Sequence, residues 1–297
     1  MSSKELGALF LLGAIWGASF LFIRVAVPTL GPFVLMDLRV GLAAAALVPY
    51  ALAVSRLPAL RARPKEFLII GALNAAIPFT LIAAAEITLT SSLAAILNST
   101  TPLFAAVVAA AWIGEALTLR KVVGLLLGVV GVATLVGLDP VSLNGAVLFS
   151  VGAVLVASCS YALGGVYAKR TFEGVPSLAM ATGQQAGAAV LLLPFAVATF
   201  PREAPSLSVA LSVLGLALLC TAVAYLLYFY LIANAGPTKT LSVTFLIPVF
   251  GLLFGILLLD EPFGLGTLVG LGVILVGVAL VTEVRLGVSG GAKTNDE

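Results

Sequence analysis

The sequence predicts an all-α integral membrane protein, with ten transmembrane helices arranged as two inverted five-helix repeats around a central cavity. Three observations support this fold class. Apolar residues make up 61% of the chain and charged residues only 9%, whereas soluble domains carry about 25% charged residues. The apolar residues form helix-length segments along the whole chain. Finally, residues 102–133 recur at residues 248–279 without a gap, and such self-similarity indicates a duplicated unit.

A membrane-spanning helix needs about 20 mostly apolar residues, and ten segments approach this length. They lie near 6–26, 33–54, 66–86, 91–113, 121–138, 146–168, 177–199, 207–233, 240–259 and 264–283. Five segments fall in each half of the chain. We therefore expect a first five-helix repeat at residues 1–143, a second at 144–285 and a cytoplasmic tail at 286–297.

The two copies of the repeated segment are related by a constant offset of 146 residues. The identical pairs are Pro102/Pro248, Phe104/Phe250, Glu115/Glu261, Leu119/Leu265, Val123/Val269, Gly124/Gly270, Leu125/Leu271, Val130/Val276, Gly131/Gly277, Val132/Val278 and Ala133/Ala279. Because five is an odd number, the second copy must enter the membrane in the opposite sense to the first. Inverted repeats commonly enclose a substrate pathway and allow alternating access. A duplication that only builds a stable bundle is the alternative.

Basic residues favour one side of this predicted topology. With a cytoplasmic N-terminus, only Arg202 falls in an outer loop, and Arg24 and Arg39 lie within or at the end of spans. The remaining basic residues are Lys4, Arg56, Arg61, Arg63, Lys65, Arg120, Lys121, Lys169, Arg170, Lys239, Arg285 and Lys293, all on the inner side. Lysine and arginine concentrate in cytoplasmic loops. We therefore expect both termini to be cytoplasmic, in a multi-pass protein of the inner or plasma membrane.

The residue inventory argues against catalysis. The chain contains no histidine, which removes imidazole acid–base chemistry, most zinc sites and histidine-containing triads. Cys159 and Cys220 lie inside predicted helices without metal-ligand spacing, and the glycines do not form a phosphate-binding loop. The sequence thus predicts no enzyme, no catalytic or metal-binding residue, no cofactor and no nucleic-acid partner.

Charged residues inside spans are informative because each costs roughly 2.5–3.5 kcal/mol at a helix centre. Arg24, Asp37, Arg39 and Glu86 all fall toward the predicted outer side. We expect Arg39 to pair with Glu86, and Asp37 and Glu86 to be the carboxylates that can exchange a proton if transport is proton-coupled. A structural salt-bridge cluster, or snorkelling of Arg24 and Glu86 to the interface, is the alternative. The position that corresponds to Arg39 in the second half is Gln185.

Two spans carry a central proline, Pro102 in the fourth and Pro248 in the ninth. Proline frees a backbone carbonyl and kinks a helix, so both prolines are candidate hinges. The neighbouring polar residues Asn98, Thr101 and Thr244 would then face a mid-membrane cavity. Contact with a solute and a purely mechanical role both remain open.

Aromatic residues deep within spans are candidates for the cavity lining, although membrane tyrosines usually form interface belts. These residues are Trp16, Tyr161, Tyr225 and Tyr228. Trp16 and Tyr161 occupy similar depths in the two halves, and Tyr225 and Tyr228 share a helix face at spacing three. Asn74 in the third span adds an amide to this predicted substrate site.

Two further features concern helix packing and helix ends. Gly124-x-x-x-Gly128 and Gly266-x-x-x-Gly270 permit close approach between helices. Glu115 and Glu261 end their helices at opposite membrane faces. We expect a structural or gate-linked role for both glutamates and no contact with substrate.

Several of these segments together resemble the EamA-like branch of the drug/metabolite transporter superfamily. The relevant motifs are Trp16-Gly17-Ala18-Ser19-Phe20, Arg39, Pro102-Leu103-Phe104 through Gly114-Glu115-Ala116-Leu117, and Pro248-Val249-Phe250 through Asp260-Glu261-Pro262. Asp260 departs from the family pattern, in which a glycine precedes this glutamate. The resemblance implies ten helices in a basket around a central cavity, and secondary active transport of small metabolites or amino acids, often outward.

We therefore expect efflux of amino acids or related metabolites by alternating access. The alternatives are an exporter of lipophilic cationic drugs, a passive pore or lipid scramblase, and a purely structural membrane protein. The expected partners are a small-molecule solute, the lipid bilayer and a proton or substrate gradient. The sequence does not fix the solute, its direction, the coupling ion or the oligomeric state.

Overall fold

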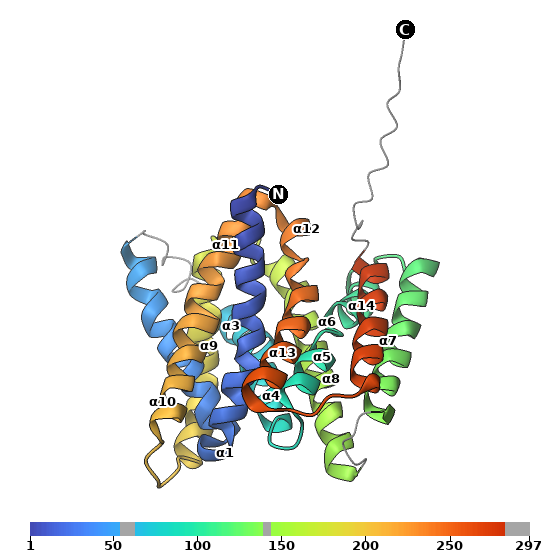
Figure 1. Cartoon of the computed structure of the whole chain (residues 1–297). Coiled ribbons are helices and arrows are strands. Elements are labelled where there is room, and N and C mark those ends of the chain that lie inside the picture. Colours follow the sequence, from blue (N-terminus) through green and yellow to red (C-terminus); the bar gives the residue numbers. More distant parts are fainter. Residues whose placement is uncertain (54–62, 139–143, 283–297) are drawn as a thin grey trace.

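The computed structural model describes residues 1–53, 63–138 and 144–282, and every regular element within these ranges is a helix. The helices run between two ends of one bundle (Figure 1). Eight are long and apolar enough to cross a membrane, and Val243–Leu259 is a shorter apolar helix. This all-helical, apolar architecture is that of an integral membrane protein.

The first two predicted spans form one 51-residue element, α1 (Ser3–Ala53), which is interrupted at Gly31. The φ angle of Gly31 is 71° and its ψ is 165°, a conformation that glycine adopts without the penalty of a Cβ. Pro28 and Pro32 flank this point. The chain therefore reverses at Gly31, and α1 consists of two limbs.

The other elements lie within a few residues of the predicted segments, but several contain breaks. They are α3 (Pro64–Gly71), η1 (Ala72–Ala76), α4 (Ile77–Ala85), α5 (Ser91–Asn98), α6 (Thr101–Ile113), α7 (Leu119–Leu138), α8 (Gly145–Thr171), α9 (Ser177–Ala198), α10 (Leu207–Leu214), η2 (Gly215–Val223), α11 (Ala224–Ala235), α12 (Pro237–Thr240), α13 (Val243–Leu259) and α14 (Leu265–Thr282). The elements η1 and η2 are π-helices.

The two ends of the bundle differ in charge. We call the end where α1 begins and α14 ends the terminal face, and the opposite end, which carries Gly31 and the connections 86–90 and 260–264, the Gly31 face (Figure 1). All lysines in the described ranges lie at the terminal face, with Arg63, Arg120 and Arg170. Arg202 lies at the Gly31 face. Arg56, Arg61, Arg285 and Lys293 fall outside the described residues.

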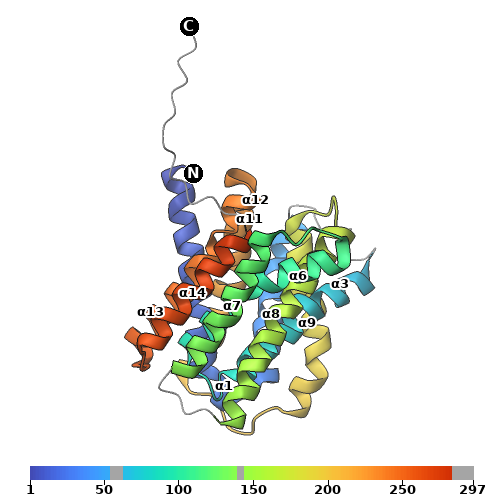
Figure 2. The ribbon, with the colours of Figure 1, turned by 90° about the vertical axis from the view of Figure 1, so that its right-hand side faces the viewer.

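Helices α7 and α14 pack side by side (Figures 1 and 2). A Cβ added at Gly124 would lie 2.6 Å from the carbonyl oxygen of Gly277, and a Cβ at Gly277 would lie equally close to that of Gly124. Gly266 and Gly270 likewise meet the α7 backbone, at Leu138 and Leu135. The predicted close approach is confirmed at these positions. Gly128 instead makes room for Leu103 of α6.

Candidate functional site

Two π-helices occupy corresponding positions in the two halves of the chain. Shifted by 146 residues, η1 (72–76) falls on 218–222, which lies inside η2 (215–223). Each carries a polar side chain, Asn74 in η1 and Thr221 in η2. Single π-helical segments are frequent at functional sites, and paired interruptions in repeated halves indicate a binding site in transporters. Together they mark the candidate site.

Arg39 links this site to the second half of the chain. Its side chain is 5% exposed, and its Nε donates to Thr221 Oγ1 at 3.1 Å. Thr221 is itself held by η2, because its hydroxyl donates to the carbonyl of Leu216 five residues earlier, at 2.8 Å. The guanidinium carbon lies 3.8 Å from the ring centroid of Phe79, within cation–π range. Arg39 is thus fixed by η2 on one side and α4 on the other.

The predicted ion pair between Arg39 and Glu86 is wrong. The side-chain hydrogen bond of Arg39 goes to Thr221, and neither carboxylate oxygen of Glu86 has a hydrogen-bond partner among the described residues. Glu86 lies at the end of α4 and is within electrostatic range of Arg39, but the guanidinium is held over the Phe79 ring.

A chain of amide and phenol groups continues from η1. Asn74 Nδ2 donates to Gln184 Oε1 at 3.5 Å, and Gln184 Nε2 donates to the hydroxyl of Tyr225. Glycines place these groups together. Gly164 leaves space for the Asn74 amide, while Gly71 allows α3 to approach α9 so closely that a Cβ there would lie 2.7 Å from the carbonyl oxygen of Gln184.

The predicted aromatic residues form two connected groups. Tyr161 contacts the ring of Phe79 edge-on, at 6.3 Å between ring centroids, and Arg39 lies over that same Phe79 ring. Trp16 pairs with Tyr228 at 5.5 Å, within an apolar cluster. Tyr225 and Tyr228 each lie 5.9 Å from the ring of Phe229. The structure therefore brings Arg39, Asn74, Tyr161 and Tyr225 to one region, with Trp16 and Tyr228 beside it.

Sequence reasoning selected Gln185 and missed its neighbour Gln184. Gln185 is fully buried, and neither of its amide atoms has a hydrogen-bond partner among the described residues. Gln184 supplies the contacts to Asn74 and Tyr225. No signal in the sequence separates the two glutamines, because each has a small residue three positions later on the same helix face, Gly187 or Ala188. Phe79 and Thr221 were also missed, since neither stands out in an apolar span.

The predicted hinge residues are placed differently in the two halves. The helix of the fourth span breaks at Ser99–Thr100, directly before Pro102, and the Asn98 carbonyl accepts from the Thr101 hydroxyl at 2.7 Å. In the ninth span the break falls at Leu241–Ser242, and Pro248 lies inside the continuous helix α13. Thr244 donates to the carbonyl of Leu241 at 2.8 Å. No hydrogen bond or ring contact within the described ranges joins Asn98 or Thr244 to Arg39.

The two candidate coupling carboxylates differ in burial. Asp37 is half-buried on the second limb of α1 and, within the described ranges, makes no hydrogen bond or ion pair. Glu86 is fully buried. Arg24 lies beside it, but its Nη1 donates to the backbone carbonyl oxygens of Glu86 and Ile87 and not to the carboxylate.

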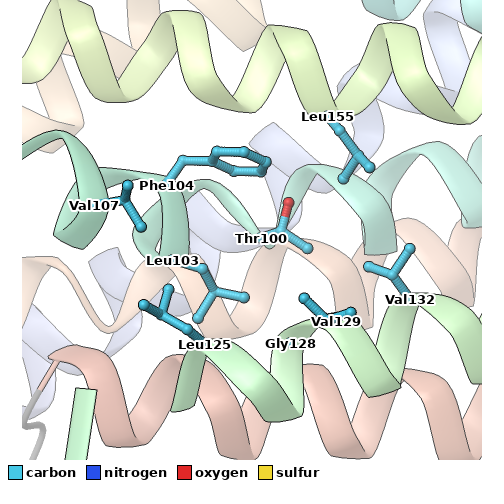
Figure 3. Close-up of a pocket in the computed structure, with 9 residues that line it drawn as sticks. All are labelled: Thr100, Leu103, Phe104, Val107, Leu125, Gly128, Val129, Val132 and Leu155. Atoms are coloured by element: carbon cyan, nitrogen blue, oxygen red, sulfur yellow. The ribbon is translucent and has the colours of Figure 1, made fainter. Parts of the chain in front are cut away.

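A separate pocket of about 330 Å³ lies between α6, α7 and α8 (Figure 3). It is lined by Thr100, Leu103, Phe104, Val107, Leu125, Gly128, Val129, Val132 and Leu155. The hydroxyl of Thr100 is already engaged, since it donates to the carbonyl of Leu97 at 2.7 Å. None of the predicted site residues lines this pocket. Its apolar wall suits a hydrocarbon chain and offers no free polar group to recognise a zwitterion.

Comparison with known proteins agrees with a membrane transport fold. The chain is 33% identical over 283 residues to the uncharacterized inner membrane transporter YedA of Escherichia coli strain K12, covering 93% of this chain and 90% of that protein. It is 24% identical over 270 residues to an uncharacterized transporter of Archaeoglobus fulgidus, covering 91% and 95% of the two chains. A chloroplastic WAT1-related protein of Arabidopsis thaliana is 31% identical over 291 residues, which cover 90% of this chain and 66% of that protein.

A solved crystal structure shares the fold, with a TM-score of 0.67 and 20% sequence identity, covering 95% of this chain and 98% of the other. The described apolar helices and the transporter relatives together define a multi-pass membrane transporter. The model of the EamA-like transporter family matches the chain twice, at residues 4–137 and 148–283, and the chain belongs to that family. The predicted family resemblance is confirmed.

Proposed function

We propose that this protein is a secondary active transporter that exports amino acids or related small metabolites by alternating access. Its ten spans would form two inverted five-helix repeats, at residues 1–143 and 144–285, with a tail at 286–297. The two limbs of α1 and the 17-residue helix α13 supply the spans beyond the seven other long helices. The two successive matches to one family model support the duplication.

The terminal face is proposed to be cytoplasmic and the Gly31 face to be external. The support is the distribution of charge, because every described lysine lies at the terminal face while Arg202 lies at the other. This asymmetry is typical of cytoplasmic loops.

The environment of Arg39 is the observation that carries the proposed substrate class. Within the described ranges, its guanidinium makes one side-chain hydrogen bond, to a neutral hydroxyl, and no ion pair. A buried guanidinium without a carboxylate partner is a ready site for the carboxylate of a solute, which it can bind with two parallel hydrogen bonds. The rings of Phe79 and Tyr161 and the amides of Asn74 and Gln184 supply the apolar and polar contacts for the rest of a small zwitterion.

Export of lipophilic cations is the second candidate, because the carboxylates of Asp37 and Glu86 have no partner within the described ranges. Either carboxylate would serve such a cation as a counter-ion, and in the amino-acid proposal either would carry a coupling proton. Asp37→Asn and Glu86→Gln distinguish the two. If the variants lose binding of lipophilic cations, the result supports cation export. If they still bind amino acids, the result supports amino-acid export.

A ligand-stabilisation screen tests the substrate class. We expect amino acids or related carboxylates to raise the melting temperature of the detergent-purified protein in a saturable way, because a ligand that binds only the folded state stabilises it. Nucleobases and lipophilic cations are the comparison sets. Stabilisation by cations alone would contradict the amino-acid proposal. No stabilisation by any set, together with solute leak from proteoliposomes, would favour a pore or scramblase.

Tyr225→Phe and Tyr228→Phe form a matched pair for the polar chain of the site. Of the two hydroxyls, only that of Tyr225 is bonded to Gln184. Tyr225→Phe therefore leaves Gln184 Nε2 without its acceptor, whereas Tyr228→Phe keeps the ring contact with Trp16. We expect Tyr225→Phe to weaken ligand binding about tenfold, since an unsatisfied buried polar group costs about 1–3 kcal/mol. We expect Tyr228→Phe to have little effect. Equal affinities for the two variants, measured by thermal-shift titration, would remove Tyr225 from the site.

A further inference from the structure

Glu261 is attached to the start of another helix in the opposite half of the chain. Its Oε1 accepts from the backbone N–H of Ser91 at 2.6 Å, and its Oε2 accepts from the N–H of Ser92 at 2.9 Å and from the Ser92 hydroxyl at 2.6 Å. Residues 91 and 92 begin α5, an eight-residue helix. Three bonds to one ionised carboxylate at a helix N-terminus form a strong contact. Glu261 is 8% exposed.

The surroundings of this contact are shaped for the carboxylate. A Cβ at Gly255 of α13 would collide with both the Ser92 hydroxyl and Glu261 Oε2. One turn earlier, a Cβ at Gly251 would lie 2.5 Å from that of Ala95, so α13 and α5 are also in close contact there. The position that corresponds to Gly255 in the first half is Ala109. The first half therefore has no glycine at the position that accommodates the Glu261 carboxylate in the second.

Glu115, the counterpart of Glu261, has the same local backbone but different partners. Each glutamate follows a residue in the left-handed region, Gly114 at φ 72° or Asp260 at φ 52°. The backbone N–H of each glutamate also donates to the carbonyl oxygen six residues earlier, at 3.3 Å for Glu115 and 3.1 Å for Glu261. However, the Glu115 side chain is 43% exposed and pairs only loosely with Lys121 and Lys169, at 3.7 and 3.6 Å.

The packing of α13 also differs between its two ends. Near the Gly31 face α13 packs against α5, but no comparably extensive contact joins it to α6, which continues the same span toward the terminal face. This comparison covers the described helices only. Helix α13 is thus joined to the fourth span near the Gly31 face and not, to a comparable extent, toward the terminal face.

We propose that Glu261, Ser91 and Ser92 form a latch that holds the Gly31 face closed, and that this latch must open in each transport cycle. The inference rests on the proposed alternating access. In the structure, Glu261, Ser91 and Ser92 join α13 to α5 at the Gly31 face. Glu115 has the same backbone setting without such a contact, and Ala109 stands there in place of Gly255. The latch is therefore particular to the Gly31 face. Glu261 is therefore a gating residue outside the solute site.

A reporter cysteine at the α5–α13 contact tests the latch. Ala95 is fully buried at this contact, and Ala95→Cys is introduced with Cys159→Ala and Cys220→Ala. The measurement is the rate at which a hydrophilic maleimide labels the purified protein. We expect Glu261→Gln to raise this rate about tenfold, because it removes the charge that strengthens three hydrogen bonds. Ser92→Ala removes one bond, so we expect a smaller increase.

Glu115→Gln is the matched control, since it makes the same substitution at the exposed counterpart, and we expect it to leave the rate unchanged. The proposal would be overturned if folded Glu261→Gln protein is labelled at the same rate as the parent protein. It would also be overturned if Glu115→Gln raises the labelling rate as much as Glu261→Gln does. If Glu261→Gln does not fold, parental labelling in Ser92→Ala overturns it instead. Labelling requires no solute. A working latch without solute exchange would therefore contradict the proposed carrier function and leave the latch supported.

Discussion

Arg39→Met is expected to abolish solute-dependent stabilisation and exchange while the protein still folds. The methionine side chain can stay against the Phe79 ring, and the Thr221 hydroxyl keeps its bond to the carbonyl of Leu216. What is lost is the cation that would bind the solute carboxylate. Truncating one partner of a buried charge pair costs about 2–5 kcal/mol, so the dissociation constant should rise at least about thirtyfold. Thermal-shift titration of the purified variant measures it.

Two further variants sharpen this result. Arg39→Lys retains the charge but not the planar fork, so we expect it to recover only part of the affinity. Arg120→Met changes an exposed arginine at the terminal face and should bind like the parent protein. Unchanged affinity in folded Arg39→Met would show that Arg39 stabilises η2 and α4 and does not bind the solute.

Gly277→Ala is expected to destabilise the protein by about 1–3 kcal/mol, the usual cost of overpacking a core. The new methyl group would lie 2.6 Å from the carbonyl oxygen of Gly124 and 3.1 Å from the backbone nitrogen of Gly128. Both atoms belong to the backbone of α7, so α7 and α14 must move apart. The melting temperature in detergent should fall by several degrees.

The control for this prediction lies on the same helix. A Cβ at Gly272 would meet nothing within 4 Å, so Gly272→Ala should be neutral or slightly stabilising, because alanine favours a helix over glycine. The two substitutions are chemically identical, but only Gly277→Ala should lower the melting temperature. Equal melting temperatures would contradict the close packing of α7 on α14.

The spans were predictable because their signal is local. Hydrocarbon thickness sets the length of each apolar segment, and every predicted segment is mostly helical over its described residues. The packing role of Gly124, Gly266 and Gly270 was also predictable, since small residues at spacing four bring helices together in membranes. In contrast, Pro248 was expected to break its helix as Pro102 does in the first half. The helix of the ninth span instead breaks at Leu241–Ser242, before Pro248.

The contacts of the site were not predictable because they depend on tertiary register. Arg39 was expected to reach a carboxylate, but the π-helix η2 presents Thr221 to it. Gln184 and Gln185 are adjacent in sequence and point in directions about 100° apart, and only the packing of α9 on η1 decides which amide meets Asn74. The π-helices themselves have no clear signature in an apolar sequence.

Counterflow in proteoliposomes tests most directly whether the protein is an alternating-access carrier. Vesicles are loaded with an unlabelled amino acid that stabilises the protein, and uptake of the labelled form is followed without an imposed ion gradient. We expect transient, saturable accumulation that exceeds uptake into empty vesicles and that Arg39→Met abolishes. Uptake that is non-saturable and indifferent to internal solute would contradict the carrier and indicate a passive pore.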